Sequence, residues 1–225
     1  MSDVTLVNAR LIDPEAGTER LGGLRISGGL IAEILSENAN GKGVVIDCGG
    51  KYLAPGIIDV GVKIGEPGER HKESFRTAGR AAAAGGVTTM VTRPDTSPAI
   101  DTPETLEFAA NRAAQAMGVR IRPMAALTKG RMGREMTEIG FLLDAGAVAF
   151  TDGDAVTTNP RVFARCLTYA KSLNALVIAH CQDPGLSDGA AVTSGKFATK
   201  QGLPSVSPMA ERMGLERDLA LVEMT

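Results

Sequence analysis

The chain has 225 residues, 44% of them hydrophobic, and a formal net charge of −2, values that are ordinary for a globular protein. The 24 Lys and Arg are balanced by 26 Asp and Glu, so no basic surface for nucleic acid is expected. No apolar run approaches the roughly 20 residues that span a bilayer, and the N-terminus lacks a signal-peptide pattern. Three cysteines without a CxxC pair fit a reducing compartment. We therefore expect a cytoplasmic protein that binds neither nucleic acid nor membrane.

The first 55 residues are predicted to form a small β domain. Runs of β-forming residues occur at 4–9, 23–26, 30–35 and 44–47. The turn Ser27-Gly28-Gly29 lies between the second and third runs and predicts a hairpin. We expect residues 1–55 to be the N-terminal part of a β-sandwich appendage.

From residue 56 to residue 225 strand and helix patterns alternate. Strands are expected at 56–62, 87–92, 120–127, 147–151 and 175–181, and helices at 73–84, 103–117, 135–145 and 160–173, before an amphipathic stretch from 208. Five βα units predict an α/β fold with a parallel sheet, either a barrel or an open sheet. No G-x-G-x-x-G follows a strand, which removes support for dinucleotide binding. In a barrel, chemistry takes place at the carboxyl ends of the strands.

Three groups of motifs carry a family resemblance. They are APGIID (54–59) with EPG (66–68) and HKE (71–73), then AAAAGGVTT (81–89) with RPDT (93–96), and finally VIAHCQD (177–183). In this order they resemble the N-terminal half of the dihydroorotase family of the amidohydrolase superfamily. The resemblance implies a metal-dependent-hydrolase-like TIM barrel, incomplete here. It also implies zinc-dependent hydrolysis of a cyclic amide, L-dihydroorotate to N-carbamoyl-L-aspartate, in pyrimidine biosynthesis.

The chain departs from the family pattern at the positions that carry the chemistry. Gly61 and Lys63 stand where the family has the HxH metal ligands, and Gly65 stands where it has the arginine that grips substrate. Asp95 replaces the asparagine of the substrate-binding MPNT motif, and Gly153 stands at one strand-4 ligand position. Glycine has no ligand atom, and an ammonium group has no lone pair. The resemblance is therefore strongest to degenerate dihydroorotases that lack the HxH motif.

Few candidates remain for chemistry. His180 and Asp152 are the residual metal-ligand candidates, and Asp152 and Asp154 are the catalytic candidates. One imidazole with one or two carboxylates makes a poor zinc site, so no cofactor is expected. If a metal is bound at all, we expect it to be zinc. Asp59 has either a structural or a residual site role. His71, in a charged run, is expected at the surface.

Lys63 has three readings: a structural lysine, a Schiff-base nucleophile, or a cation that replaces the metal by pairing with Asp59, Asp152 or Asp154. Three functions follow from these alternatives. The first is a catalytically inactive partner of aspartate transcarbamoylase, as the resemblance implies for degenerate members. The second is an active cyclic-amide hydrolase with an altered site, and the third is a lysine-centred enzyme. Because five strands leave a barrel open, we expect a longer protein, a homo-oligomer or a second chain that covers the open side.

Overall fold

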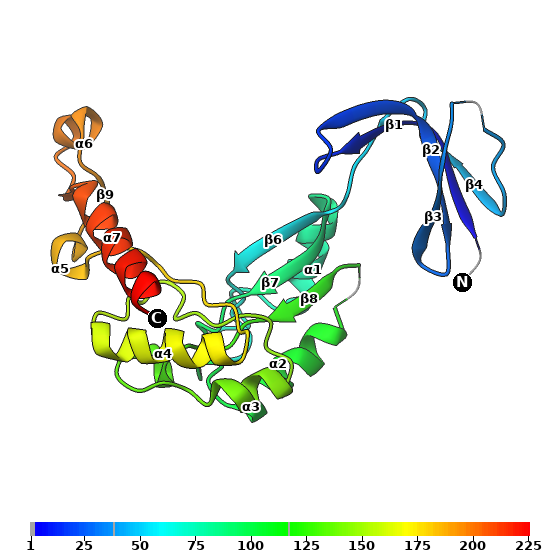
Figure 1. Cartoon of the computed structure of the whole chain (residues 1–225). Coiled ribbons are helices and arrows are strands. Elements are labelled where there is room, and N and C mark those ends of the chain that lie inside the picture. Colours follow the sequence, from blue (N-terminus) through cyan, green and yellow to red (C-terminus); the bar gives the residue numbers. More distant parts are fainter. Residues whose placement is uncertain (1–2, 38, 117) are drawn as a thin grey trace. The chain divides into compact units, whose positions relative to one another are not determined.

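The computed structural model describes residues 3–37, 39–116 and 118–225, and it divides the chain into two compact units (Figure 1). The first unit comprises residues 1–56 and the second comprises residues 57–225. Strands dominate the first unit, whereas strands and helices alternate in the second. The predicted α/β class of the larger unit is confirmed. None of the described helices is long and apolar enough to cross a bilayer.

The first unit is one five-stranded mixed sheet. Its strands pair in the order β3-β2-β1-β4, and the short β5 pairs with β1. Gly28 and Gly29 have φ angles of +59° and +82°, which suits the tight turn between β2 and β3. A sandwich needs a second layer, and the described residues provide a single sheet here. The strands are β1 (Val4–Asp13), β2 (Thr18–Ser27), β3 (Leu30–Leu35), β4 (Val44–Asp47) and β5 (Tyr52–Leu53).

The second unit begins with three parallel strands in sequential order, β6-β7-β8. Helices α1 and α2 connect them, and each begins with a capping box, at Ser74 and at Thr102 respectively. Such caps satisfy the first free N–H groups of a helix. The bounds are β6 (Ile57–Val62), α1 (Phe75–Ala84), β7 (Val87–Thr92), α2 (Pro103–Ala114) and β8 (Arg120–Pro123).

The fourth and fifth predicted strands are shorter than the sequence suggests. Phe150 forms isolated parallel bridges with Ala125 on one side and Val177 on the other. The N–H of Phe150 donates to the carbonyl of Leu176 at 2.9 Å, and the N–H of Ile178 donates to Phe150 at 2.9 Å. The sheet thus continues in barrel order but with minimal pairing. The fifth strand segment pairs with no further strand among the described residues, so the sheet ends there.

Later elements also differ from expectation. Of the helix predicted over 135–145, only α3 (Ile139–Asp144) forms. Met136 instead makes an antiparallel β-bridge with Thr128, and the hydroxyl of Thr137 donates to the carbonyls of Ala126 and Leu127. Polar bonds to the strand end therefore hold residues 135–138 extended. The remaining elements are the 3₁₀ turn η1 (Lys129–Arg131), α4 (Pro160–Ser172), α5 (Pro184–Ser187), β9 (Val192–Thr193), α6 (Lys196–Gln201), β10 (Ser205–Val206) and α7 (Met209–Met224).

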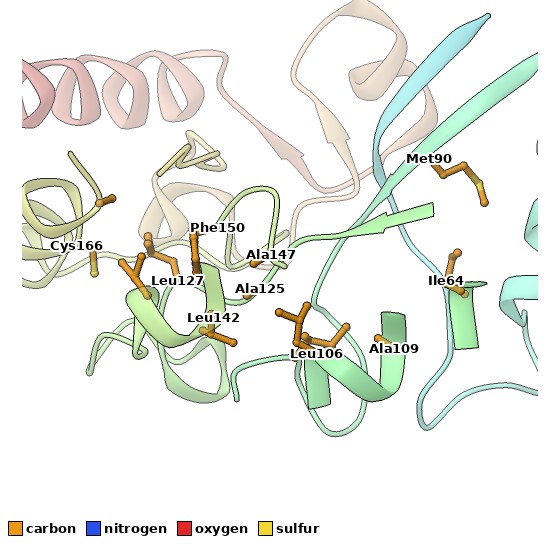
Figure 2. Packing of buried hydrophobic residues seen from close by; sticks show 14 of the residues in the cluster. Ile64, Met90, Leu106, Ala109, Ala125, Leu127, Leu142, Ala147, Phe150 and Cys166 are labelled. Atoms are coloured by element: carbon orange, nitrogen blue, oxygen red, sulfur yellow. The ribbon is translucent and has the colours of Figure 1, made fainter. Parts of the chain in front are cut away.

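The core of the second unit contains residues from both the strands and the helices (Figure 2). Met90 of β7, Leu106 of α2 and Phe150 are each at most 2% exposed. On β6, by contrast, Ile57, Ile58 and Val60 are 56–63% exposed. The described strands therefore form part of a barrel wall whose first edge is open and apolar.

Helix α7 approaches the end of the fifth strand segment backbone to backbone. A Cβ atom on Gly214 would lie 2.6 Å from the backbone nitrogen of Gln182, and the N–H of Asp183 donates to the carbonyl of Ala210 at 2.9 Å. Only glycine allows this contact. We predict that Gly214→Ala lowers the free energy of unfolding by about 1–3 kcal/mol through overpacking. Gly195→Ala, where a Cβ meets nothing within 4 Å, is the control in urea denaturation, and equal effects would contradict this packing.

Candidate functional site

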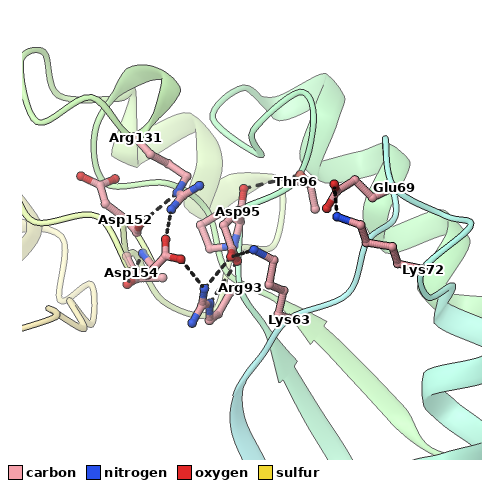
Figure 3. Close-up of polar contacts among 12 residues, drawn as sticks. Lys63, Glu69, Lys72, Arg93, Asp95, Thr96, Arg131, Asp152 and Asp154 are labelled. Atoms are coloured by element: carbon pink, nitrogen blue, oxygen red, sulfur yellow. Dashed lines mark hydrogen bonds and ion pairs between the residues drawn. The ribbon is translucent and has the colours of Figure 1, made fainter. Parts of the chain in front are cut away.

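The polar groups of the second unit gather at the carboxyl ends of its strands. Lys63 follows β6, Arg93 and Asp95 follow β7, Arg131 lies in η1, and the segment 152–154 follows the fourth strand segment. Figure 3 shows that the side chains of Lys63, Arg93, Asp95, Arg131 and Asp154 point toward one another. Parallel strands bring these loops together at one edge, as the sequence pattern predicted.

A buried carboxylate, Asp95, lies at the centre of this group (Figure 3). Its side chain is 1% exposed, and Nζ of Lys63 lies 3.0 Å from its Oδ2. The guanidinium of Arg93 binds it in a bidentate manner, with Nε donating to Oδ1 at 3.0 Å and Nη2 donating to Oδ2 at 2.5 Å. Lys63 therefore pairs with a carboxylate, as one of its readings required, but its partner is Asp95 and not Asp59, Asp152 or Asp154.

Opposing effects set the protonation of Asp95. Burial would raise the pKa of its carboxyl, but hydrogen bonds from Arg93 and Lys63 outweigh burial and hold the pKa below the ordinary value. In the same way, the hydrogen bond that Arg93 donates to Asp95 raises the pKa of the Arg93 guanidinium. Both charges are therefore stabilised by the pair.

Asp152 is 5% exposed and accepts four hydrogen bonds. Its Oδ1 receives the backbone N–H groups of Leu127 at 3.1 Å and Thr128 at 2.9 Å. Its Oδ2 receives the hydroxyls of Thr128 at 2.6 Å and Thr157 at 3.0 Å. These donors use the acceptor capacity of the carboxylate, so in this structure Asp152 ties the loop after β8 to the loop after the fourth strand segment.

The neighbouring Asp154 is 60% exposed and is held by two arginines. Arg131 pairs with its Oδ1, and Nη2 of Arg93 lies 3.6 Å from its Oδ2. Nε of Arg131 also donates to the backbone carbonyl of Asp152 at 2.8 Å. Lys63, Arg93 and Arg131 thus form an ion-pair network with Asp95 and Asp154, and Arg131 links this network to the backbone of Asp152.

Two glycines at positions where the family resemblance expects metal ligands border these cations. A Cβ atom on Gly61 would lie 3.9 Å from Cδ of Arg93. A Cβ atom on Gly153 would lie 3.4 Å from Nε of Arg93 and 3.5 Å from Nη2 of Arg131. Both glycines have positive φ, +94° and +67°, where side chains are strained. The arginines therefore lie beside the places where the family resemblance puts metal ligands.

Gly65 and Glu66 have structural roles that motif reading missed. A Cβ atom on Gly65 would lie 2.5 Å from the carbonyl oxygen of Glu69, so the family's arginine does not fit this tight turn. Glu66 is 4% exposed, accepts from the N–H of Phe75 at 3.1 Å and pairs with Nε of Arg112 at 2.8 Å. Its carboxylate therefore joins the start of α1 to α2.

The remaining predicted residues lie apart from this group. His180 is exposed, and its Nε2 lies 3.1 Å from the side-chain oxygen of Gln182. It shares the lining of a small cavity with Asp152, but no hydrogen bond joins the two in the described structure. Asp59 on β6 and His71 are both exposed. The surface placement of His71 agrees with expectation.

A zinc ion takes three or four nitrogen, sulfur or carboxylate ligands. Within residues 3–37, 39–116 and 118–225, no group of three such side chains is placed to hold a metal. The donor chemistry gives the reason. Gly61 offers no ligand atom, Lys63 donates to Asp95, and Asp152 is occupied by N–H and O–H donors. The donor set at these strand ends does not fit zinc.

The buried bonds of Asp152 generate a stability prediction. Asp152→Ala would leave four donors without their acceptor, and at about 1 kcal/mol or more for each unsatisfied group the loss should be about 3 kcal/mol or larger. Asp154→Ala, which removes a mostly exposed carboxylate, should cost less than about 1 kcal/mol. Urea denaturation with and without a chelator measures both. A loss at Asp152 that appears only without chelator would indicate a metal ligand instead.

The lowered pKa of Asp95 predicts a loss of stability in acid. A carboxyl whose folded-state pKa is depressed contributes stability above its unfolded value, here near 3.8, and loses it as the pH falls through the lower folded value. The wild type should therefore be more stable than Asp95→Asn at about pH 6, and the difference should shrink toward about pH 3. Urea midpoints across that range measure it, and a constant difference would refute the argument.

Comparisons with known proteins agree on one family. The family model described as "Dihydro-orotase-like" matches residues 50–224. A "Dihydroorotase-like protein" of Pseudomonas putida is 38% identical over 99% of this chain and 53% of its own length, and a "Dihydroorotase" of Bacillus licheniformis is 37% identical over 96% and 50%.

The solved structures show the same fold at lower identity. An L-hydantoinase (dihydropyrimidinase) from Arthrobacter aurescens superimposes with a TM-score of 0.79 at 22% identity, covering 100% of this chain and 51% of that one. A dihydroorotase crystal structure superimposes with a TM-score of 0.57 at 15% identity, covering 98% and 63%. The chain spans about half the length of the curated relatives it matches. On its sequence and its partial barrel, the chain belongs to the dihydroorotase-like family.

Proposed function

We propose that this chain is a catalytically inactive dihydroorotase-like protein of pyrimidine biosynthesis in the cytoplasm. The observation that supports this most directly is at the second HxH position, where the ammonium of Lys63 lies 3.0 Å from the buried carboxylate of Asp95. An ion pair occupies the position from which the family resemblance expects a metal ligand. A name of the form "Dihydroorotase-like" on the relative from Pseudomonas putida is consistent with this proposal.

Hydrolysis of a cyclic amide needs an activated water and a group that polarises the carbonyl. The remaining acidic groups are already engaged, Asp152 with four donors and Asp154 with two arginines. Asp95, at the substrate-binding position, is neutralised by Lys63 and Arg93. These contacts leave no free carboxylate in the group to act as a base or to bind a cation.

The alternative is an active metal-dependent cyclic-amide hydrolase with an altered site at Asp152, Asp154 and His180. That function would require Asp152 to release its donors and His180 to turn away from Gln182. The lysine-centred alternative requires an amine at residue 63 that is free to attack a carbonyl, whereas Nζ of Lys63 lies 3.0 Å from Oδ2 of Asp95. Borohydride trapping with a carbonyl substrate tests this third function.

We also propose a partner chain. The family resemblance points to aspartate transcarbamoylase, and the exposed apolar side chains on β6, Ile57, Ile58 and Val60, support a covered barrel edge. A homo-oligomer is the other arrangement that would cover this edge. Size-exclusion chromatography of the chain alone and with aspartate transcarbamoylase distinguishes the two. A shift only in the mixture supports the enzyme partner, and a monomer in both samples contradicts the proposal.

The inactive function has a direct test. We expect purified protein to carry far less than one zinc ion per chain by elemental analysis and to give no hydrolysis of L-dihydroorotate above background, with or without added zinc. An authentic dihydroorotase assayed in parallel is the positive control. Two tightly bound zinc ions per chain, or turnover that a chelator abolishes, would establish the active alternative.

A further inference from the structure

The region where the family resemblance expects the metal not only lacks ligand residues but is also bordered by cations on several sides. Arg93 approaches Gly61 and Gly153, and its guanidinium pairs with both Asp95 and Asp154. Its side chain is 24% exposed, so its charge lies within the group and not in open solvent. Among the described residues, Arg93 is the cation whose side chain contacts two carboxylates of the group and also borders two of the altered ligand positions.

We infer that the Arg93 guanidinium has taken over the structural role of the metal, joining the loops after β7 and after the fourth strand segment and excluding a divalent cation. This inference rests on the proposed inactive function. On this view two features exclude a metal: the ligand residues are missing, and the charge of Arg93 repels a cation. Lys63 and Arg131 complete the same charge balance from the loops after β6 and β8.

Geometry explains why the substitutions belong together. Arg93 stands where the family motif MPNT has methionine, and Asp95 stands where it has asparagine. An arginine two residues before a buried aspartate forms the bidentate pair that the structure contains. A side chain on Gly61 or Gly153 would extend toward Arg93. The glycines leave room for the guanidinium, and the guanidinium in turn neutralises Asp95 and Asp154.

Nε and Nη2 of Arg93 lie 3.4 and 3.5 Å from the Cβ position of Gly153, and a fixed cation so close to a ligand position opposes a dication there through Coulomb repulsion, even with the screening usual near a protein surface. Restoring the two histidines alone should therefore not restore metal binding. The arginine must be removed as well, and Asp95 must then become asparagine so that no buried carboxylate loses its partners.

The experiment compares two variants that differ only at residue 93. Both carry Gly61→His, Lys63→His and Asp95→Asn, and the second also carries Arg93→Met. Zinc binding is measured by titration calorimetry, and zinc content by elemental analysis after gel filtration. We expect at least tenfold tighter binding in the variant with Arg93→Met. Because both share the strain of a histidine at Gly61, that strain cancels in the comparison.

A matched control removes a different cation. Arg134→Met, at an exposed position, in the variant that retains Arg93 should change zinc affinity by less than about threefold, since charges in open solvent are screened within about 10 Å. Equal zinc affinity with and without Arg93, or an equal gain from Arg134→Met, would overturn the inference. Zinc-dependent activity of the unmodified chain would instead overturn the proposed function, so the two failures are distinguishable.

A second measurement keeps the inference testable if the multiple variants do not fold. In the unmodified background, Arg93→Met should lower the melting temperature by several degrees, on the order of 5 °C. Combining it with Asp95→Asn should recover most of that loss, because the carboxylate that needed a partner is gone. Circular dichroism follows both transitions. A melting temperature unchanged by Arg93→Met, or a double variant no better than the single one, would also overturn the inference.

Discussion

The arrangement of the strand ends depends on one buried carboxylate. Asp95 is shielded from water, and an ionised carboxylate in such a place needs cationic partners or strong donors. Arg93 from its own loop and Lys63 from the loop after β6 supply them. Through Arg93 the same network reaches Asp154, and through Arg131 it reaches the backbone of Asp152. Four loops are thereby held by charges that the chain itself provides.

This network has a physical consequence for the charges at the strand ends. A cluster of carboxylates without a cation would repel itself, because like charges at close range are costly. Here the six charged groups balance, and Asp152 is satisfied by neutral donors from Leu127, Thr128 and Thr157. The arrangement of the strand ends is thus self-sufficient in charge.

Sequence patterns predicted the elements that depend on local signals. The strands β6 and β7 and the helices α1, α2 and α4 follow from apolar runs, caps and glycine stops. The strand segments around Phe150 and Val177 were predicted too long, because their extent depends on neighbouring strands and not on their own composition. The short elements between 184 and 206 were not predicted, since none is long enough to have a periodic pattern.

For the site, the altered positions Gly61, Lys63 and Asp95 were visible in the motifs, and so was the change to Arg93, although its role was not. Pairing across loops cannot be read from spacing, so Lys63 was assigned the wrong carboxylates. Arg131 had no sequence signal at all. Its position depends on the turn η1. The loop that contains this turn is held by the hydroxyl of Thr128, which donates to Asp152, and by the hydroxyl of Thr137, which donates to the carbonyl of Ala126.

The sequential order of the parallel strands has a consequence for how the chain folds. Each strand pairs with the next one along the chain, from β6 through β7 and β8 to the segments at Phe150 and Val177. Paired residues on adjacent strands are about 30 positions apart, as in Ile57 with Val87 and Thr89 with Arg120, so each pairing needs only the next βα unit and no distant part of the chain. During synthesis, each βα unit can therefore dock on the one already formed while the ribosome is still adding the next. The barrel wall grows in the direction of translation, and its apolar β6 edge is the first part of it to be made.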